Sequence, residues 1–194
     1  AAAASPATAG AYCVMDAQTG EVICQKNAYA RMEMASTTKV MTALVALENA
    51  PLSLTVRITR AEAGTEGSSM YLRAGDVYTL EDLLLGMMLV SGNDAALAVA
   101  KAVAGSEASF VHLMNEKAQE IGMCDTHFDN PHGLHSQQHY TSAYDLALLC
   151  GYAMQNAEFC RIVGCKSTGI KELTRGETRV MVNKNRFIYA FEGA

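Results

Sequence analysis

The feature that most constrains this chain is a long apolar stretch in its middle, which is broken once by three residues. Residues 80–90 are almost all apolar, residues 94–103 are rich in alanine, and Ser91-Gly92-Asn93 separates the two runs. Apolar runs of this length and composition predict two helices joined by a tight turn. Such a turn can point the Ser91 hydroxyl and the Asn93 amide into a cleft; the plainer alternative is that both residues are ordinary helix caps.

Further helices and a few short strands are expected on both sides of this pair. Apolar periodicity and capping residues predict helices over residues 36–49, 110–121 (capped by Ser106) and 142–154. A β-hairpin is expected over residues 11–26, a strand over residues 54–59 and strand-like pieces beyond residue 165. Helices grouped in the middle, with strands before and after them, are typical of an α+β fold. So few strands make an incomplete sheet for so many helices.

Composition limits the classes of function. The chain has 194 residues, 50% of them hydrophobic, which suits one domain or at most two small ones with a sizeable core. Its net charge of −5 argues against nucleic acid as a partner, because a nucleic-acid binder needs a basic face. No apolar run approaches the roughly 20 residues that span a bilayer. Residues 1–10 are predicted to be a flexible N-terminal segment, whose composition fits what remains after a signal peptide is removed.

The cysteines show no pattern typical of a metal site, and no metal or cofactor is expected. The six cysteines contain no Cys-x-x-Cys spacing. If Asp16 pairs with Glu21 in the hairpin, Cys13 lies opposite Cys24. Two alternatives for this pair then remain open: a cross-strand disulfide, or two small side chains in the core. Cys150 lies in an apolar run and is predicted to be a buried thiol.

Four of the five histidines crowd into the polar loop over residues 122–141. Their spacing fits no helical or finger-type ligand pattern, so a loop ordered by histidine hydrogen bonds is favoured over a metal site. Glu62, Glu66 and Asp76 are predicted to form the solvated face of a loop.

Ser36-Thr37-Thr38-Lys39 is the first candidate for chemistry. On a helix, the Ser36 hydroxyl and the Lys39 ammonium lie on one face about one turn apart. A serine hydroxyl is a poor nucleophile alone, but a lysine kept neutral by burial and by neighbouring cations can act as its base. Ser-x-x-Lys occurs by chance about once in a chain of this length, so by itself it is more often an N-cap serine and a surface lysine.

The two motifs together, in this order, resemble a known family. ASTTKVMTA (residues 35–43) and LVSGNDAA (residues 89–96) look like the nucleophile segment and second motif of serine D-alanyl-D-alanine carboxypeptidases, the low-molecular-mass penicillin-binding proteins. FDNPHGL (residues 128–134) and HYTSAYDLA (residues 139–147) are similar to the segment that follows in that family. The opening hairpin is also similar, and the resemblance extends over about residues 11–190.

The resemblance implies a fold shared with serine β-lactamases, in which a helical cluster packs on an antiparallel sheet. It implies that Ser36 is the acylated nucleophile, with its backbone N–H as one arm of the oxyanion hole, and that Lys39 is the general base. It also implies that Ser91 assists proton transfer to the leaving D-Ala and that Asn93 binds the peptide carbonyl of the substrate. The expected substrate is a peptidoglycan stem peptide ending in D-Ala-D-Ala, and β-lactams are expected to acylate the same serine.

One motif of that family is missing. Its Lys-Thr-Gly strand supplies the cation for the substrate's terminal carboxylate and a second oxyanion N–H, and it should follow residues 183–185. No such motif follows before Ala194. The run over residues 166–169 (Lys-Ser-Thr-Gly) is a poor substitute, because its extra serine changes which strand face each side chain occupies; a polar strand or turn is favoured. Residues 11–194 are therefore expected to be the N-terminal portion of a penicillin-binding transpeptidase-like domain.

Three hypotheses of function remain. The leading one is an exported, extracytoplasmic serine carboxypeptidase, with any membrane anchor outside this chain. The second is a catalytically incomplete or non-enzymatic fragment, which dimerises by strand exchange or needs a C-terminal partner fragment to supply the remaining strands. The third, a serine β-lactamase, is disfavoured because the chain has no Glu-x-x-Leu-Asn segment for deacylation and carries Ser91-Gly92-Asn93 where class A enzymes commonly have Ser-Asp-Asn.

Overall fold

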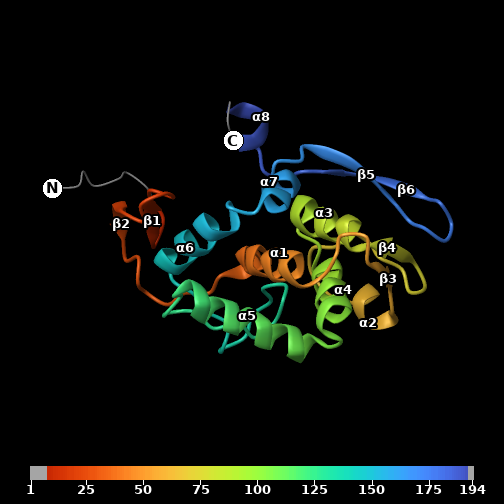
Figure 1. The fold of residues 1–194 in the computed structure, drawn as a ribbon, viewed down its shortest axis with the longest axis horizontal. Coiled ribbons are helices and arrows are strands. Elements are labelled where there is room, and N and C mark those ends of the chain that lie inside the picture. Colours follow the sequence, from red (N-terminus) through yellow and green to blue (C-terminus); the bar gives the residue numbers. More distant parts are fainter. Residues whose placement is uncertain (1–7, 192–194) are drawn as a thin grey trace.

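The computed structural model describes residues 8–191, in which helices predominate (Figure 1). The helices are α1 (Thr38–Asn49), α2 (Arg60–Ala63), α3 (Leu80–Val90), α4 (Asn93–Ala104), α5 (Glu107–Ile121), α6 (Ala143–Ala153), α7 (Ala157–Val163) and α8 (Phe187–Ala190), and a 3-10 turn, η1 (Ala35–Thr37), precedes α1. The strands are β1 (Tyr12–Met15), β2 (Val22–Lys26), β3 (Thr55–Arg57), β4 (Val77–Thr79), β5 (Ser167–Lys171) and β6 (Thr178–Val182).

The strands form antiparallel pairs around the helical cluster. Within residues 8–191 they make three separate two-stranded sheets, β1-β2, β3-β4 and β5-β6. Figure 1 shows β1-β2 at one end of the molecule and the β5-β6 hairpin at the other, with helices between them. The predicted α+β class, with helices packed beside antiparallel strands, is confirmed.

Helices α3 and α4 pack against each other in the core, as expected from their apolar sequences. Leu80, Leu83 and Leu84 of α3 are fully buried, and α4 is lined with buried alanines where it meets α1, α3 and α5. Alanine allows close approach because its side chain adds little width. The turn between the two helices lies at Ser91, whose φ of 63° ends α3 in the left-handed conformation. The following Asn93 is thereby buried at the start of α4.

Capping residues set the helix starts. The Ser106 hydroxyl accepts the N–H of Ser109 and the Ser142 hydroxyl accepts the N–H of Asp145, each at 3.1 Å. Because Ser106 is the N-cap, α5 begins directly after it and not at residue 110, where the apolar pattern starts. Helices α2, α7 and α8 were not predicted, since helices of only 4 to 7 residues show too little periodicity to be recognised.

Two expectations about the cysteines are wrong. The first hairpin turns as predicted, but a bulge after Val14 shifts the register, so that Cys13 lies opposite Gln25 and Cys24 lies opposite Val14. One extra residue in a strand moves every pair beyond it, and turn residues alone do not reveal the bulge. All six cysteines are free thiols, and Cys150 is exposed on its helix.

Two of the three acidic residues predicted to face solvent are buried. Glu62 and Asp76 are 2% and 0% exposed, whereas Glu66 is exposed. Glu62 pairs with the Lys101 ammonium at 2.7 Å, and Asp76 pairs with the Arg175 guanidinium. The prediction failed because these cations come from α4 and from the turn between β5 and β6, and local sequence does not reveal such distant partners.

The β5-β6 hairpin is fixed to β4 and to the loop that precedes it. The buried Glu172 carboxylate accepts the N–H of Val77 at 2.9 Å, and Arg179 donates to the Tyr71 carbonyl at 2.6 Å. The run over residues 166–169 leads into and opens β5, as the prediction of a polar strand or turn requires.

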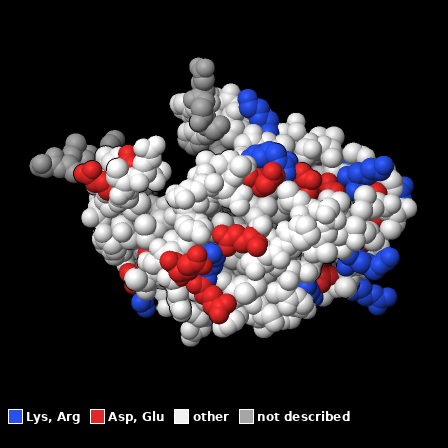
Figure 2. Space-filling view, in the orientation of Figure 1, with Lys and Arg blue, Asp and Glu red and all other residues white. Residues whose placement is uncertain are grey.

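The surface carries charges of both signs. Figure 2 shows one face on which acidic and basic side chains are dispersed among a larger uncharged area. No helix within residues 8–191 is both long enough and apolar enough to cross a bilayer. The flexible segment predicted over residues 1–10 lies mostly outside the described residues; residues 8–10 are exposed.

Candidate active site

Ser36 lies at an abrupt change of backbone direction just before α1. Its predecessor Ala35 has a φ of +46°, in the left-handed region that residues other than glycine seldom adopt. The turn η1 then leads into α1, which begins at Thr38. The Ser36 side chain is exposed, so its hydroxyl is accessible to a ligand.

Lys39 lies one helical turn further on and is 2% exposed. Its Nζ is 2.7 Å from Asn93 Oδ1, 2.7 Å from the His132 carbonyl oxygen and 3.1 Å from Ser36 Oγ. The two carbonyl-type oxygens can only accept hydrogen bonds, so each of them accepts a hydrogen bond from one N–H of the amine. When Lys39 is neutral, the remaining lone pair is therefore left for the Ser36 hydroxyl.

The surroundings of Lys39 favour that neutral form. The pKa of Lys39 is lowered to about 8, chiefly because the amine is buried; the carboxylate of Asp94 opposes this shift, and charge repulsion from Lys184 adds a smaller lowering. Lys184 is held in place because its Nζ donates to the Val90 carbonyl at 2.8 Å. An appreciable fraction of Lys39 is thus unprotonated near neutral pH.

Asn93 joins Lys39 to the loop that precedes β4. Its Nδ2 donates to the Glu66 carbonyl at 2.8 Å, which sets the orientation of the amide and leaves Oδ1 facing Lys39. Its backbone N–H donates to the Ser68 carbonyl at 2.7 Å. Because Nδ2 carries two hydrogens, one of them is left for a ligand.

Ser91 borders this group without joining it. It is half-buried at the turn between α3 and α4, and its hydroxyl makes no hydrogen bond within residues 8–191. Of the four predicted site residues, the structure therefore brings Ser36 and Asn93 each into direct contact with Lys39. Ser91 lies two residues from Asn93 on the same turn.

Asp94 is a supporting residue whose importance sequence reasoning missed. It is 1% exposed, and its carboxylate accepts the N–H groups of Met70 and Leu72, both at 3.0 Å, and the Ser69 hydroxyl at 2.6 Å. These bonds hold the loop against the N-terminus of α4, where the helix dipole favours a negative charge. The sequence feature that could have revealed Asp94 is an acidic residue at the start of an apolar helix. A carboxylate buried there needs hydrogen-bond donors from a neighbouring segment.

The histidine-rich loop is fixed to α1 and η1 at two further points. Thr42 Oγ1 donates to the Pro131 carbonyl at 2.6 Å, and Gly133 packs directly on Ala35. Gly133 has a φ of +90°, and a Cβ at this position would lie 1.9 Å from the Ala35 carbonyl oxygen. Only glycine fits this contact.

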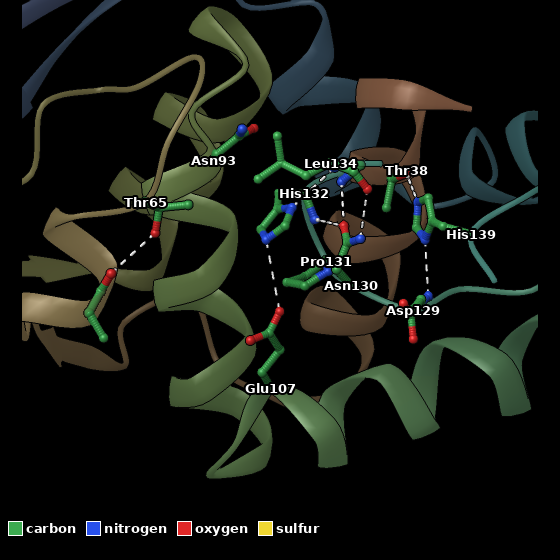
Figure 3. A network of polar contacts seen from close by, with 12 residues as sticks. Thr38, Thr65, Asn93, Glu107, Asp129, Asn130, Pro131, His132, Leu134 and His139 are labelled. Atoms are coloured by element: carbon green, nitrogen blue, oxygen red, sulfur yellow. Dashed lines mark hydrogen bonds and ion pairs between the residues drawn. The ribbon is translucent and has the colours of Figure 1, made fainter. Parts of the chain in front are cut away.

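Histidine side chains order this loop, as predicted. His139 lies between the Thr38 hydroxyl and the Asp129 N–H, and His132 Nε2 lies 3.8 Å from the Glu107 carboxylate (Figure 3). Burial lowers the pKa of His132 and of His139 to about 4 in each case, so both rings are neutral near pH 7. In the part of the chain that the structure describes, no three His, Cys, Asp or Glu side chains are grouped to hold a metal ion.

This arrangement is suited to covalent chemistry at a serine. An exposed hydroxyl lies 3.1 Å from a buried amine of lowered pKa, which can take the proton as the oxygen forms a bond to an electrophilic carbon. The backbone N–H of Ser36 has no hydrogen-bond acceptor among residues 8–191, so it can donate to an oxygen that becomes negative.

Comparison with known proteins assigns this chain to a family. The sequence profile of peptidase family S11, described as D-alanyl-D-alanine carboxypeptidase, matches residues 1–192. The chain belongs to this family. The resemblance carried by the two motifs is thereby confirmed.

Relatives of this S11 chain include named carboxypeptidases and solved structures. It is 35% identical over 185 residues to D-alanyl-D-alanine carboxypeptidase DacF of Bacillus subtilis (strain 168), which covers 93% of the chain and 47% of the relative. It is 35% identical over 216 residues to a D-alanyl-D-alanine carboxypeptidase of Streptomyces sp. (strain K15), covering 98% of the chain and 74% of the relative. The chain thus spans about half the length of DacF.

Solved structures show the same fold. A mutant of the Streptomyces K15 DD-transpeptidase superimposes with a TM-score of 0.92 at 32% identity, over 98% of this chain and 80% of that one. The D-alanyl-D-alanine carboxypeptidase DacD from Francisella tularensis gives a TM-score of 0.88 at 29% identity, over 100% of this chain and 59% of that one. The predicted penicillin-binding, transpeptidase-like fold is confirmed.

The contact between Gly133 and Ala35 predicts the effect of a single added methyl group. Gly133→Ala is expected to destabilise the protein by about 1–3 kcal/mol or more, because its Cβ overlaps the Ala35 carbonyl. The matched control is Gly151→Ala in α6, where a Cβ has nothing within 4 Å; it is expected to stabilise by about 0.5–1 kcal/mol. Chemical denaturation followed by circular dichroism measures both, and a Gly133→Ala protein as stable as the wild type contradicts the packing described above.

Proposed function

We propose that this chain carries out acyl transfer through Ser36. The observation that carries the proposal is the 3.1 Å contact between the exposed Ser36 hydroxyl and the buried Lys39 amine, whose pKa is lowered to about 8. In the proposed reaction, Ser36 Oγ forms a bond to a carbonyl carbon and Lys39 Nζ takes the hydroxyl proton. The Ser36 N–H donates to the carbonyl oxygen as it becomes negative.

Asn93 and Ser91 are proposed to complete the reaction. The second hydrogen on Asn93 Nδ2 donates to the peptide carbonyl of the bound substrate. The Ser91 hydroxyl passes the proton from Lys39 to the leaving nitrogen, so that the C–N bond breaks and an amine departs. A water molecule then attacks the ester on Ser36, which releases the acid and restores the hydroxyl.

The substrate is proposed from the names of the relatives. A D-alanyl-D-alanine carboxypeptidase acts on a peptide that ends in D-Ala-D-Ala, as peptidoglycan stem peptides do, and the proposed leaving amine is then the terminal D-Ala. A β-lactam presents a cyclic amide to the same serine, and its opened ring keeps the leaving nitrogen attached. Because peptidoglycan lies outside the cytoplasmic membrane, an exported, extracytoplasmic location follows from this substrate.

Residues 11–194 are proposed to be the N-terminal portion of a transpeptidase-like domain. Matches that cover 47% of DacF and 59% of the DacD structure support this interpretation. The outer edges of the β1-β2 pair have no strand partner within residues 8–191, and β1 and α6 border an apolar groove of about 570 Å³. Unpaired strand edges favour pairing with another chain, which supports association with a second copy.

Acylation by benzylpenicillin tests the proposed function. The intact mass of the chain is expected to increase by one molecule of benzylpenicillin, and Ser36→Ala is expected to abolish the increase because the attacking oxygen is gone. Ser167→Ala, which removes an exposed hydroxyl on β5, is the matched control and is expected to react as the wild type does.

The other outcomes separate the alternative functions. An adduct that forms and is hydrolysed rapidly, with continuous release of opened penicillin, favours the β-lactamase hypothesis. A folded chain that forms no adduct contradicts acyl transfer by this chain and favours the catalytically incomplete fragment.

The lowered pKa of Lys39 predicts how acylation depends on pH. The rate is expected to rise with pH through about 8, because only the neutral amine can take the proton from Ser36. Lys184→Gln removes a repelling charge, so it is expected to raise the pKa of Lys39 and move the profile to higher pH. Lys26→Gln on β2 is the control and leaves the profile in place. Adduct formation timed at several pH values measures this, and a flat profile contradicts the role of Lys39.

Association with a second copy predicts a concentration-dependent mass. Size-exclusion chromatography with light scattering is expected to show a species above the 20.7 kDa of one chain. Ile23→Lys on the exposed side of β2 is expected to weaken the association of the two copies, since an edge lysine disfavours strand pairing. Leu173→Lys, exposed near the end of β5, is the control. A single chain at all concentrations contradicts the association.

A further inference from the structure

The backbone conformation of Ala35 needs support from outside η1. A φ of +46° is unfavourable for alanine, because its Cβ approaches the following carbonyl oxygen. Such a conformation persists only where the surrounding structure holds it. Ala35 directly precedes Ser36, so its conformation also sets the orientation of the nucleophile's own peptide group.

A chain of three hydrogen bonds reaches Ala35 from the histidine-rich loop through Thr38, the first residue of α1. The Asp129 N–H lies 3.0 Å from His139 Nδ1, His139 Nε2 lies 2.7 Å from Thr38 Oγ1, and Thr38 Oγ1 lies 2.8 Å from the Ala35 carbonyl oxygen. Figure 3 shows the His139 ring placed between Thr38 and Asp129. Both Thr38 and His139 are buried, so water does not compete for these bonds.

The direction of this chain follows from its first donor. A backbone N–H can only donate, so His139 Nδ1 accepts and the proton of the neutral ring is on Nε2. Nε2–H then donates to Thr38 Oγ1, and the Thr38 hydroxyl proton is directed to the Ala35 carbonyl. Burial and the charge of His127 lower the pKa of His139 to about 4 and Asp129 opposes them, so the ring is neutral near pH 7.

We propose that His139 is a positioning residue that, through Thr38, aims the Ser36 N–H at the reacting carbonyl oxygen. In a trans peptide the C=O of one residue and the N–H of the next point in opposite directions. Holding the Ala35 carbonyl towards Thr38 therefore turns the Ser36 N–H away from α1, where it has no acceptor among residues 8–191. The inference rests on the proposed acyl transfer at Ser36.

Gly133 supports the same peptide from the other side. Its Cα lies so close that an added Cβ would be 1.9 Å from the Ala35 oxygen and 3.0 Å from the Ser36 nitrogen. The Ala35–Ser36 peptide is thus enclosed between Gly133 and the Thr38 hydroxyl. Gly133 supplies a steric limit, whereas hydrogen bonds from the Thr38 hydroxyl and from the Thr38 backbone N–H direct the Ala35 carbonyl; His139 acts on the first of these two bonds.

Two substitutions of His139 separate the effect of its hydrogen bond to Thr38 from the effect of its packing in the loop. The amide nitrogen of glutamine occupies the place of Nε2, so His139→Gln keeps a donor to Thr38. The amide of asparagine occupies the place of Nδ1, so His139→Asn keeps the partner of the Asp129 N–H but leaves Thr38 without a donor. We expect the benzylpenicillin acylation rate to fall about 10- to 100-fold in His139→Asn and much less in His139→Gln, at similar melting temperatures.

Two matched substitutions of Thr38 test the same chain of hydrogen bonds. Thr38→Ser keeps the hydroxyl, whereas Thr38→Val keeps the shape and loses it. Thr38→Val is expected to slow acylation as His139→Asn does, and the double variant is expected to be no slower than either single one, because both break the same connection. His112→Asn, on the exposed surface of α5, is expected to react at the wild-type rate.

A readout that does not require activity is the φ of Ala35 in crystal structures of the same variants. It is expected to stay positive in His139→Gln and Thr38→Ser and to leave that region in His139→Asn and Thr38→Val. Equal acylation rates in His139→Asn and His139→Gln, or an unchanged φ in both, overturn the inference. If the wild type forms no adduct while φ responds as expected, the proposed acyl transfer fails and the positioning of Ala35 stands.

Discussion

A lysine amine buried between two carbonyl-type oxygens is the constraint on which the rest of this structure depends. A charged lysine in the interior is costly, so the fold supplies Asn93 Oδ1 and the His132 carbonyl as partners at 2.7 Å each. These partners come from two elements far apart in the chain, and each needs support of its own. Asp94 anchors the start of α4 to the neighbouring loop, and Gly133 lets the histidine-rich loop lie against η1.

Elements with strong local patterns could be predicted from the sequence. Helix α3 spans residues 80–90, as its apolar run indicates, and Ser106 and Ser142 cap the helices that follow them. The proximity of Ser36 and Lys39 follows from helical spacing alone. Bringing Asn93 to the same place required the family resemblance, because no periodicity relates α4 to α1.

Features that depend on distant partners could not be predicted. Glu62 and Asp76 look like solvated loop residues until the cations from α4 and from the β5-β6 turn are known. The bulge in the first hairpin changes the partner of Cys13 without any change in the residues of the turn. His139 is one of several loop histidines in the sequence, and only the fold places it between Thr38 and Asp129.

The two oxygens that hold Lys39 lie 54 and 93 residues away from it along the chain. Until α4 and the histidine-rich loop have docked on α1, Lys39 is an ordinary lysine with a pKa near 10.4, protonated in water and unable to act as a base. Ser36 is then an unactivated alcohol. In the proposed mechanism, a nascent or partly opened chain therefore does not react at Ser36, although it already contains the complete Ser-x-x-Lys motif. If Ser36 is acylated as proposed, its reactivity depends on the closed tertiary structure, and the extent of Ser36 labelling counts the molecules that have reached it.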